Sequence, residues 1–181
     1  MLQNIFSLIV NAVASVLGGV LLLRFWMQLI RVRPPASIGQ FLFQVSDWLV
    51  RPLRRLLPGF GGVDWASLAG AFLMALAAIV VDVWALPAFS FGTVFILALL
   101  RLFQWIFYGF MASLIIDAVF SWVNPLAPLA PFVRALNDPL LRPLRRIIPL
   151  IGNIDLSPLA ALLLLQIALR VVSTVLLSSA L

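Results

Sequence analysis

Four long apolar stretches constrain this 181-residue chain more than any other feature of its sequence. They cover about residues 5–30, 65–86, 91–123 and 156–178. A helix needs about 20 apolar residues to cross a bilayer, and only helices and closed barrels satisfy their backbone hydrogen bonds in lipid. The stretches therefore predict an all-α membrane protein with four transmembrane helices. The third stretch is longer than a bilayer requires, so we expect it to tilt, to bend near Gly109 or to emerge from the membrane.

The composition excludes several classes of chemistry. The chain is 64% hydrophobic and 10% charged, far from the roughly half-apolar, quarter-charged balance of a soluble domain. It has no Cys and no His, every basic residue is Arg and every acidic residue is Asp. Disulfides, thiolate metal sites and Cys or His catalysis are thereby excluded. No two aspartates lie at a catalytic spacing, so we predict a protein that is not an enzyme and that uses no metal or cofactor.

A 22-residue segment occurs twice. Residues 47–68 and 138–159 align without a gap at an offset of 91, and 11 of the 22 positions are identical. Each copy holds an Arg-Pro-Leu-Arg-Arg turn, at 51–55 and 142–146, which is followed by a shared proline, glycine and aspartate. The duplication predicts two tandem repeats of a two-helix unit, residues 1–90 and 91–181, related by a pseudo-twofold axis along the membrane normal.

Arginine placement predicts the orientation of the chain. Nine of the 12 arginines lie in the two long loops, at positions 31, 33, 51, 54 and 55 and at 134, 142, 145 and 146. The positive-inside rule then places both loops in the cytoplasm and both termini outside. The sequence AVAS at 12–15 resembles a signal cleavage site. It lacks a preceding basic region, however, and the apolar run continues past it, so we expect the first helix to be retained.

The loops themselves have periodic segments. In the first loop, apolar residues from Ile38 to Leu49 follow helical spacing after Ser37, a good N-cap, which predicts a helix lying at the membrane surface. Proline disfavours helix at the residue before it, so Pro52 predicts a new short helix at 52–57 that ends before Pro58. The second loop predicts a similar short helix at 143–148. Its residues 124–131, NPLAPLAP, are too rich in proline for a long one.

The two arginine turns are the first candidate site. Their residues are Arg51, Arg54, Arg55, Arg142, Arg145 and Arg146. One interpretation is topological, since positive charge keeps a loop inside. The other is a docking patch for an anionic lipid headgroup or an acidic protein, because each arginine near an anionic leaflet contributes about 1 kcal/mol. Nucleic acid is a poor fit, because no stacking aromatics are interleaved in the turns.

The aspartates and the intramembrane charges form the second set of candidates. Asp64 and Asp155 open the second and fourth helices and are expected to cap them, with ion coordination as the alternative. Counted at about 1.5 Å per residue, Arg24 and Asp117 lie at one depth and Asp82 and Arg170 at another, on counterpart helices. We therefore expect the crossed pairs Arg24–Asp117 and Asp82–Arg170, with an ion or proton path as the alternative. Arg101 falls nearer the outer interface, where it can snorkel.

The doubled motif resembles the YggT family, called YlmG in some lineages. The resemblance covers the whole chain and rests on Arg51–Pro58 with Gly61 and Asp64, on Arg142–Pro149 with Gly152 and Asp155, and on LLLRFWMQ at residues 21–28. The two-repeat form is similar to the proteobacterial branch and implies a multi-pass protein of the bacterial inner membrane. The resemblance links such proteins to osmotic-stress tolerance, ion uptake, division or cytochrome assembly. Because the chain has no His or Cys, a cytochrome role would be scaffolding.

Two functions follow from these observations. The first is a non-enzymatic scaffold or assembly factor whose arginine turns bind a cytoplasmic partner or anionic lipid. The second is a small channel or ion-transport component, alone or as a homo-oligomer, that uses the intramembrane charges. Four helices alone rarely enclose a pathway, which favours the scaffold. A continuous polar cavity would favour the second.

Overall fold

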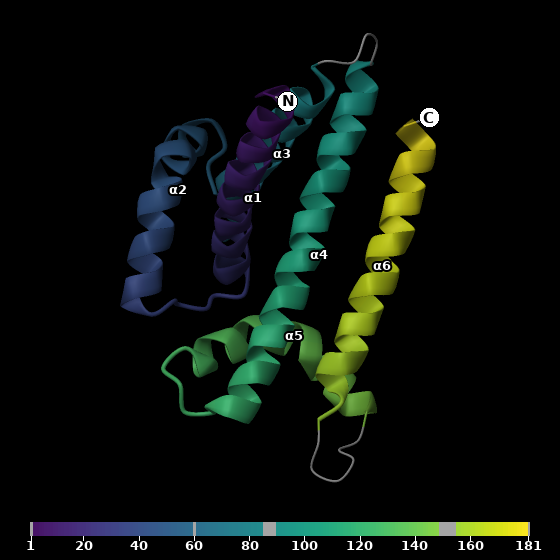
Figure 1. Cartoon of the computed structure of the whole chain (residues 1–181). Coiled ribbons are helices and arrows are strands. Elements are labelled where there is room, and N and C mark those ends of the chain that lie inside the picture. The colour runs from purple at the N-terminus through teal and green to yellow at the C-terminus, as the bar shows by residue number, and fades with distance from the viewer. Residues whose placement is uncertain (1, 60, 85–89, 149–154, 181) are drawn as a thin grey trace.

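The computed structural model describes residues 2–59, 61–84, 90–148 and 155–180 (Figure 1). Within these ranges the chain forms six α-helices: α1 (Leu2–Leu29), α2 (Ala36–Leu56), α3 (Trp65–Val83), α4 (Phe91–Val123), α5 (Ala130–Ile147) and α6 (Ser157–Ala180). Helices α1, α3, α4 and α6 are long and apolar enough to cross a membrane, which confirms the all-α membrane fold. Pro149, Gly152 and the end of the second predicted span, residues 85 and 86, lie outside the described residues.

The helices pack in the same scheme in each half of the chain. In the first half α1 and α3 run antiparallel and α2 packs on both; in the second half α4 and α6 run antiparallel and α5 packs on both. The halves join where α4 packs on α3 and α1. Figure 1 shows α6 beside α4, at the edge of the bundle away from α2. The predicted repeat boundary at residue 90 and the pseudo-twofold axis stay predictions.

Helix α3 packs closely because small residues line its inner face. Ala66, Ala71, Ala75 and Ala78 are almost completely buried, and the first two and Ala75 belong to the core cluster that also holds Leu21 of α1. In lipid the hydrophobic effect does not drive helices together, so small residues that allow close van der Waals contact dominate such interfaces. Close van der Waals packing of small residues therefore holds the antiparallel helices α1 and α3 together.

The crossing of α1 and α4 depends on Gly18. A Cβ atom at this position would lie 2.3 Å from the Trp105 ring of α4, so a larger residue would force that ring or the helices to shift. Farther along the pair, the rings of Trp26 and Phe110 meet edge to face with centroids 4.8 Å apart. The Trp26 indole N–H also donates to the Leu136 carbonyl of α5, at 3.0 Å. Helix α5 thus closes the end of the α1–α4 pair.

The two loop helices correct the sequence prediction. Helix α2 begins after Pro35 rather than being capped by Ser37, and it continues through Pro52 to Leu56 instead of restarting there. Helix α5 begins at Ala130 and contains Pro139 and Pro143, although a long helix was not expected in this loop. Tertiary packing outweighs the lost hydrogen bonds, because Val50 of α2 and Leu141 of α5 are completely buried beside these prolines.

Local backbone chemistry fixes the helix ends. Helix α1 ends in a Schellman motif, in which Arg31 has φ +58°, its N–H donates to the Gln28 carbonyl and the Val32 N–H donates to the Met27 carbonyl. Gly61, with φ +66°, makes a sharp turn before α3. The Ser90 hydroxyl caps α4 by accepting the Thr93 N–H at 3.1 Å.

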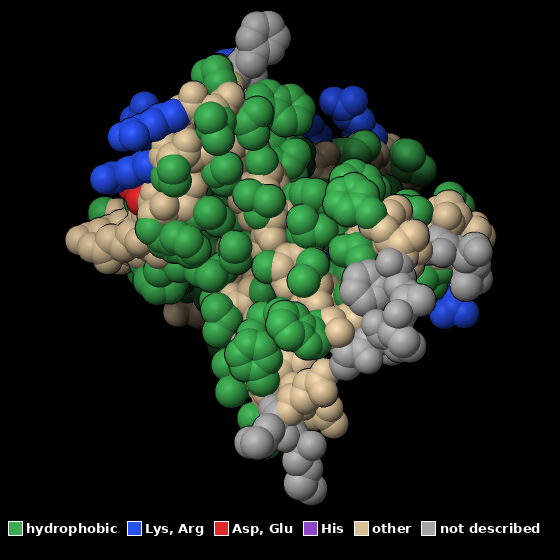
Figure 2. All heavy atoms as spheres, turned by 90° about the horizontal axis from the view of Figure 1, so that it is seen from above, with side chains coloured by type: hydrophobic (Ala, Val, Ile, Leu, Met, Phe, Trp, Pro, Cys, Tyr) green, Lys and Arg blue, Asp and Glu red, His purple; other side chains and the backbone are tan. Residues whose placement is uncertain are grey.

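The surface of the bundle is strongly apolar. Seen from above, hydrophobic side chains cover the middle of the face and arginines stand only at its rim (Figure 2). Helix α6 contributes a long exposed row, Leu159, Leu163, Leu164, Ile167, Val171 and Val175. Such a surface suits contact with lipid chains, because water would disfavour so large an apolar area.

Candidate functional site

A buried arginine is the centre of a charged network in the first half of the chain. Arg24 of α1 is only 5% exposed and donates from Nη1 to the Ser46 hydroxyl and to the Asp47 carboxylate of α2, both at 2.7 Å. Its guanidinium also lies over the Phe43 ring, 4.8 Å from the centroid. A planar guanidinium stacks and bonds at the same time, so Arg24 fixes α2 against α1.

Asp64 extends this network to the start of α3. Arg54 of α2 donates to its two carboxylate oxygens, at 3.3 and 2.7 Å, and the Ser67 hydroxyl donates at 2.7 Å. Arg24 Nε lies 3.5 Å from Asp64 Oδ2. Asp64 occupies the N-cap position, but its carboxylate accepts no backbone N–H of α3, contrary to the expected capping. Asp64 is instead the anion that ties the ends of three helices together.

The hydrogen bonds in the network lower the pKa values of its carboxyl groups. The hydrogen bond from Arg24 is the largest cause that holds the pKa of Asp47 below its ordinary value. Burial alone would raise the pKa of Asp64, but hydrogen bonds from Arg54 and Ser67 outweigh burial and lower it. The Asp64 hydrogen bond in turn raises the pKa of Arg54. Both aspartates are therefore charged at neutral pH and compensate the buried arginine.

The second half repeats the outer part of this network. Arg142 pairs with Asp138, four residues before it, as Arg51 pairs with Asp47 at 2.9 Å. Arg145 Nε donates to Asp155 at 2.8 Å, across the same ten-residue separation that joins Arg54 to Asp64. Each turn is therefore held by two ion pairs, one within its own helix and one to the start of the next membrane helix. We call these two ion pairs the clasp of the turn.

The Asp155 carboxylate accepts the backbone N–H of Ser157, the first residue of α6, at 2.9 Å. Asp155 thus satisfies a backbone N–H at the start of its helix, which Asp64 does not do at the start of α3. It does so from one residue outside the N-cap position. Burial would raise the pKa of Asp155, but the hydrogen bonds from Ser157 and Arg145 outweigh burial and lower it.

The centre of the network differs between the halves. Asp117 follows the buried Leu114 by three residues in α4, as Arg24 follows the buried Leu21 in α1, so an aspartate stands where the first half has its arginine. One turn earlier, the Ser113 hydroxyl donates to the Asn137 side chain at 2.9 Å and links α4 to α5 without charge. Asp155 is 30% exposed, against 2% for Asp64. The first network is therefore buried around a central arginine, and the second is open to solvent.

The crossed pairing of intramembrane charges is wrong. Arg24 pairs with Asp47 and lies near Asp64, and no ion pair between described residues includes Asp117 or Arg170. Depth along a helix does not specify which way a side chain points. Arg24 faces α2 and α3, and Arg170 is exposed on α6, which packs on α4 and α5.

Asp82 instead belongs to a second polar cluster, between α1, α3 and α4. Arg101 Nη2 donates to its carboxylate at 3.2 Å, and the Ser7 hydroxyl and the Asn11 amide each donate at 2.6 Å. Arg101 also donates to the Asn11 oxygen at 3.3 Å. Because Asp82 is in α3 and Arg101 in α4, their ion pair joins the two halves of the chain.

The six turn arginines are not equivalent. Arg51, Arg54, Arg142 and Arg145 are held by aspartates. Arg55 and Arg146, the last arginine of each turn, are exposed and form no ion pair with any described residue. The shared Asp and Arg spacing of the two copies is the signal that could have separated these groups. Nothing in the sequence pattern singled out Ser46, Ser7, Asn11 or Asn137.

No group of three acidic side chains comes together as a metal site in the part of the chain that the structure describes. In the charged networks, each aspartate is already paired with an arginine. The charge that remains to attract another molecule is therefore positive.

Comparisons with known proteins agree with this architecture. The family model described as CCB3/YggT matches residues 3–85 and again 96–176. An uncharacterised protein YggT of Escherichia coli strain K12 is 34% identical over 91% of this chain and 87% of its own length. Uncharacterised proteins of Pseudomonas aeruginosa and Vibrio alginolyticus are 35% and 31% identical, over 82% and 92% of this chain and 78% and 92% of their own lengths. No solved structure matches.

Proposed function

Taking as premise that this chain belongs to the CCB3/YggT family, we propose that it is a non-enzymatic scaffold of the bacterial inner membrane. Its arginine turns dock an acidic segment of a cytoplasmic protein, and anionic lipid headgroups compete for the same charges. The observation that carries this proposal is the repeated clasp, which fixes two arginines of each turn and leaves the third exposed.

The clasp supports docking because it orders the turn before a partner arrives. Arg55 and Arg146 each follow directly on an arginine that is bonded to the start of a membrane helix. A charge on a rigid support binds with less loss of conformational freedom than a charge on a free loop. The two exposed arginines therefore form two matched, pre-organised contacts.

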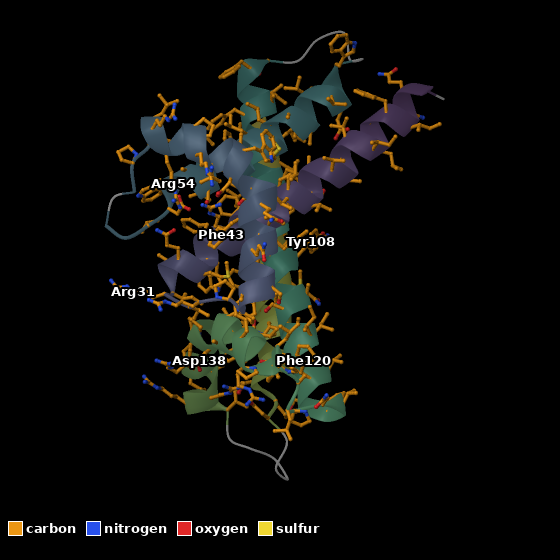
Figure 3. All side chains as sticks on the ribbon, turned by 90° about the vertical axis from the view of Figure 1, so that its left-hand side faces the viewer. Arg31, Phe43, Arg54, Tyr108, Phe120 and Asp138 are labelled. Carbon is orange, nitrogen blue, oxygen red and sulfur yellow. The ribbon has the colours of Figure 1, made fainter. Side chains whose placement is uncertain are left out.

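The placement of the charges also supports one docking face. In Figure 3, Arg31 and Arg54 of the first half and Asp138, the clasp residue of the second turn, lie at the same side of the molecule, away from Tyr108 and Phe120. With the long loops in the cytoplasm and both termini outside, as the positive-inside rule requires, this face meets both the anionic leaflet and cytoplasmic proteins.

The test compares two double variants in native membranes. Arg55→Gln with Arg146→Gln is expected to remove docking, whereas Arg31→Gln with Arg33→Gln removes equal charge from outside the turns and retains it. Docking is read by crosslinking from a photoreactive residue at position 56 or 147, both exposed. Equal crosslinking in both variants would leave the turns as topological signals only.

A lipid arm separates the two ligands that the turns attract. Binding of the purified protein to vesicles that contain phosphatidylglycerol is measured with rising salt, which screens exposed charges. If the turn variant loses vesicle binding and the wild type crosslinks to no protein, the lipid headgroup is the ligand.

The alternative is a small channel or ion-transport component. In the first half, the described polar groups form one cluster around Arg24 and another around Asp82, which Arg101 of α4 joins. Buried Leu21, Ala71 and Ala75 belong to an apolar core cluster in the same half. A transport path needs polar groups that continue through the membrane. The separation of the clusters favours the scaffold.

A further inference from the structure

We propose that the groove between α1 and α4 holds one acyl chain of an anionic phospholipid from the leaflet on the α5 side. The groove encloses about 450 Å³. Its walls include Leu23 and Trp26 of α1 and Ile106 and Phe110 of α4, and Phe132 and Leu136 of α5 form its floor. This site goes beyond the proposed docking function, because none of the turn arginines lines it.

Two contacts between α1 and α4 bound this groove. The rings of Trp26 and Phe110 meet edge to face and line it. The helices are also in contact at Gly18, where an added Cβ would lie 2.3 Å from the Trp105 ring. Beyond this contact the groove continues along both helices to α5, which is tied to α1 by the Trp26–Leu136 hydrogen bond. Apart from Ser113, the lining side chains are apolar. A space of this kind in the hydrocarbon layer is suited to an apolar chain rather than to water.

The length of the groove matches one leaflet. Its lining on α4 runs from Trp105 to Ile116, a rise of 11 residue steps or about 16 Å at 1.5 Å per residue. The hydrocarbon core of a bilayer is about 30 Å thick, so one leaflet contributes about 15 Å. A transmembrane helix of a partner needs the full thickness and would meet α5 at the floor. A lipid chain that starts at the level of α5 needs only this length.

Charge at the floor selects the headgroup. Arg134 of α5 directly follows Val133, which also lines the groove. Arg134 is exposed and forms no ion pair with any described residue. Val32, between Arg31 and Arg33, packs in the same apolar cluster as Phe132. Three arginines are therefore sequence neighbours of residues that line the groove or pack in the cluster at its α5 end, where the phosphate of a bound lipid would lie.

Glycines in the groove allow a direct test. A Cβ at Gly109 meets no atom within 4 Å, so Gly109→Phe places a ring in the groove without disturbing the helices. Gly92→Phe is the matched control on the same helix, because a Cβ there meets only the Ser90 hydroxyl at 3.6 Å. Native mass spectrometry of the detergent-released protein, titrated with phosphatidylglycerol, counts the lipids that each variant retains.

The wild type and Gly92→Phe are expected to retain one tightly held phosphatidylglycerol, and Gly109→Phe to bind it on the order of tenfold more weakly. Arg134→Gln is expected to lose the preference for phosphatidylglycerol over phosphatidylcholine while still retaining one lipid. Equal retention by Gly109→Phe and Gly92→Phe would overturn the proposal. So would a wild type that retains no lipid but forms a dimer that Gly109→Phe dissociates. Arg55 and Arg146 are intact in all these variants, so failure here leaves the docking function standing.

Discussion

At the scale of single residues, Arg24 decides how the first three helices meet. It is buried and bonds two residues of α2, and its Nε lies near Asp64 at the start of α3. We predict that Arg24→Gln lowers the free energy of unfolding in detergent by about 3 kcal/mol, since Ser46 and Asp47 lose a charged donor in a buried place.

Arg33→Gln is the control for Arg24→Gln. Arg33 is exposed, and its replacement is expected to change stability by less than about 0.5 kcal/mol. Denaturant unfolding of both purified variants measures the difference. Equal stabilities would show that the network does not hold the helices together.

The lowered carboxyl pKa values predict how stability depends on pH. Asp47, Asp64 and Asp155 all have a pKa below the ordinary 3.8, so the unfolded chain binds more protons than the folded chain just below that pH. The stability from these groups is complete above pH 3.8 and is lost as pH falls through the folded pKa values. The thermal midpoint in detergent should therefore be flat from neutral pH to about pH 5 and fall below about pH 4. A midpoint that falls between pH 7 and 5 would contradict this assignment.

The sequence predicted which residues carry charge inside the bundle but not their partners. Asp82 and Arg101 are 19 residues apart and meet only because α3 and α4 pack together. Helix length predicts the depth of a residue, but the direction of its side chain depends on the packing of neighbouring helices, which residue spacing does not encode. The ion pair of Arg54 with Asp64 could have been predicted from the sequence, because the same Arg and Asp recur ten residues apart in the second half.

At the scale of helices, proline ends a helix in the two loops less strongly than the sequence predicts. Helix α2 passes through Pro52 and helix α5 through Pro139 and Pro143. A proline in a helix interior costs roughly 3 kcal/mol. Val50 and Leu53, which flank Pro52, both pack in the core cluster of the first half, and this burial compensates the loss. The four membrane helices were predicted well because their apolar length is a property of sequence alone.

The crossing of α1 and α4 gives a prediction for these elements. Gly18→Ala should lower the thermal midpoint in detergent by several degrees, because its Cβ would lie 2.3 Å from the rigid Trp105 ring and push the helices apart. Gly19→Ala is the matched control, since a Cβ there meets nothing within 4 Å and alanine favours helix. Identical midpoints for the two variants would argue that the helices do not cross at Gly18.

At the scale of the whole molecule, the ion pair between Asp82 and Arg101 joins the two halves. Asp82→Asn and Arg101→Gln should each destabilise the protein in detergent, and the double variant should recover part of the loss. A double-mutant cycle isolates the coupling, expected at about 1–2 kcal/mol. The cycle of Asp82→Asn with Arg170→Gln serves as control and should show additivity, since Arg170 is exposed on α6. Additivity in both cycles would mean that Asp82 and Arg101 do not interact.

The orientation of the molecule is tested by labelling. Single cysteines replace Asn124 and Ala36, at the two long loops, and Ser179, near the other end of α6; all three residues are exposed. An impermeant thiol reagent should label position 179 in intact cells and leave 36 and 124 unlabelled until the membrane is opened. Labelling of the loop positions from outside would reverse the orientation.

The ten-residue clasp has a mechanical consequence. In each half, an arginine beside the exposed one is bonded to the aspartate that begins the next membrane helix. A pull on Arg55 or Arg146 is therefore transmitted through this bond directly into α3 or α6. Asp64 is buried in the first half, whereas Asp155 is open to solvent in the second. We therefore expect the bond to Asp155 to yield first when a load is shared between the two turns.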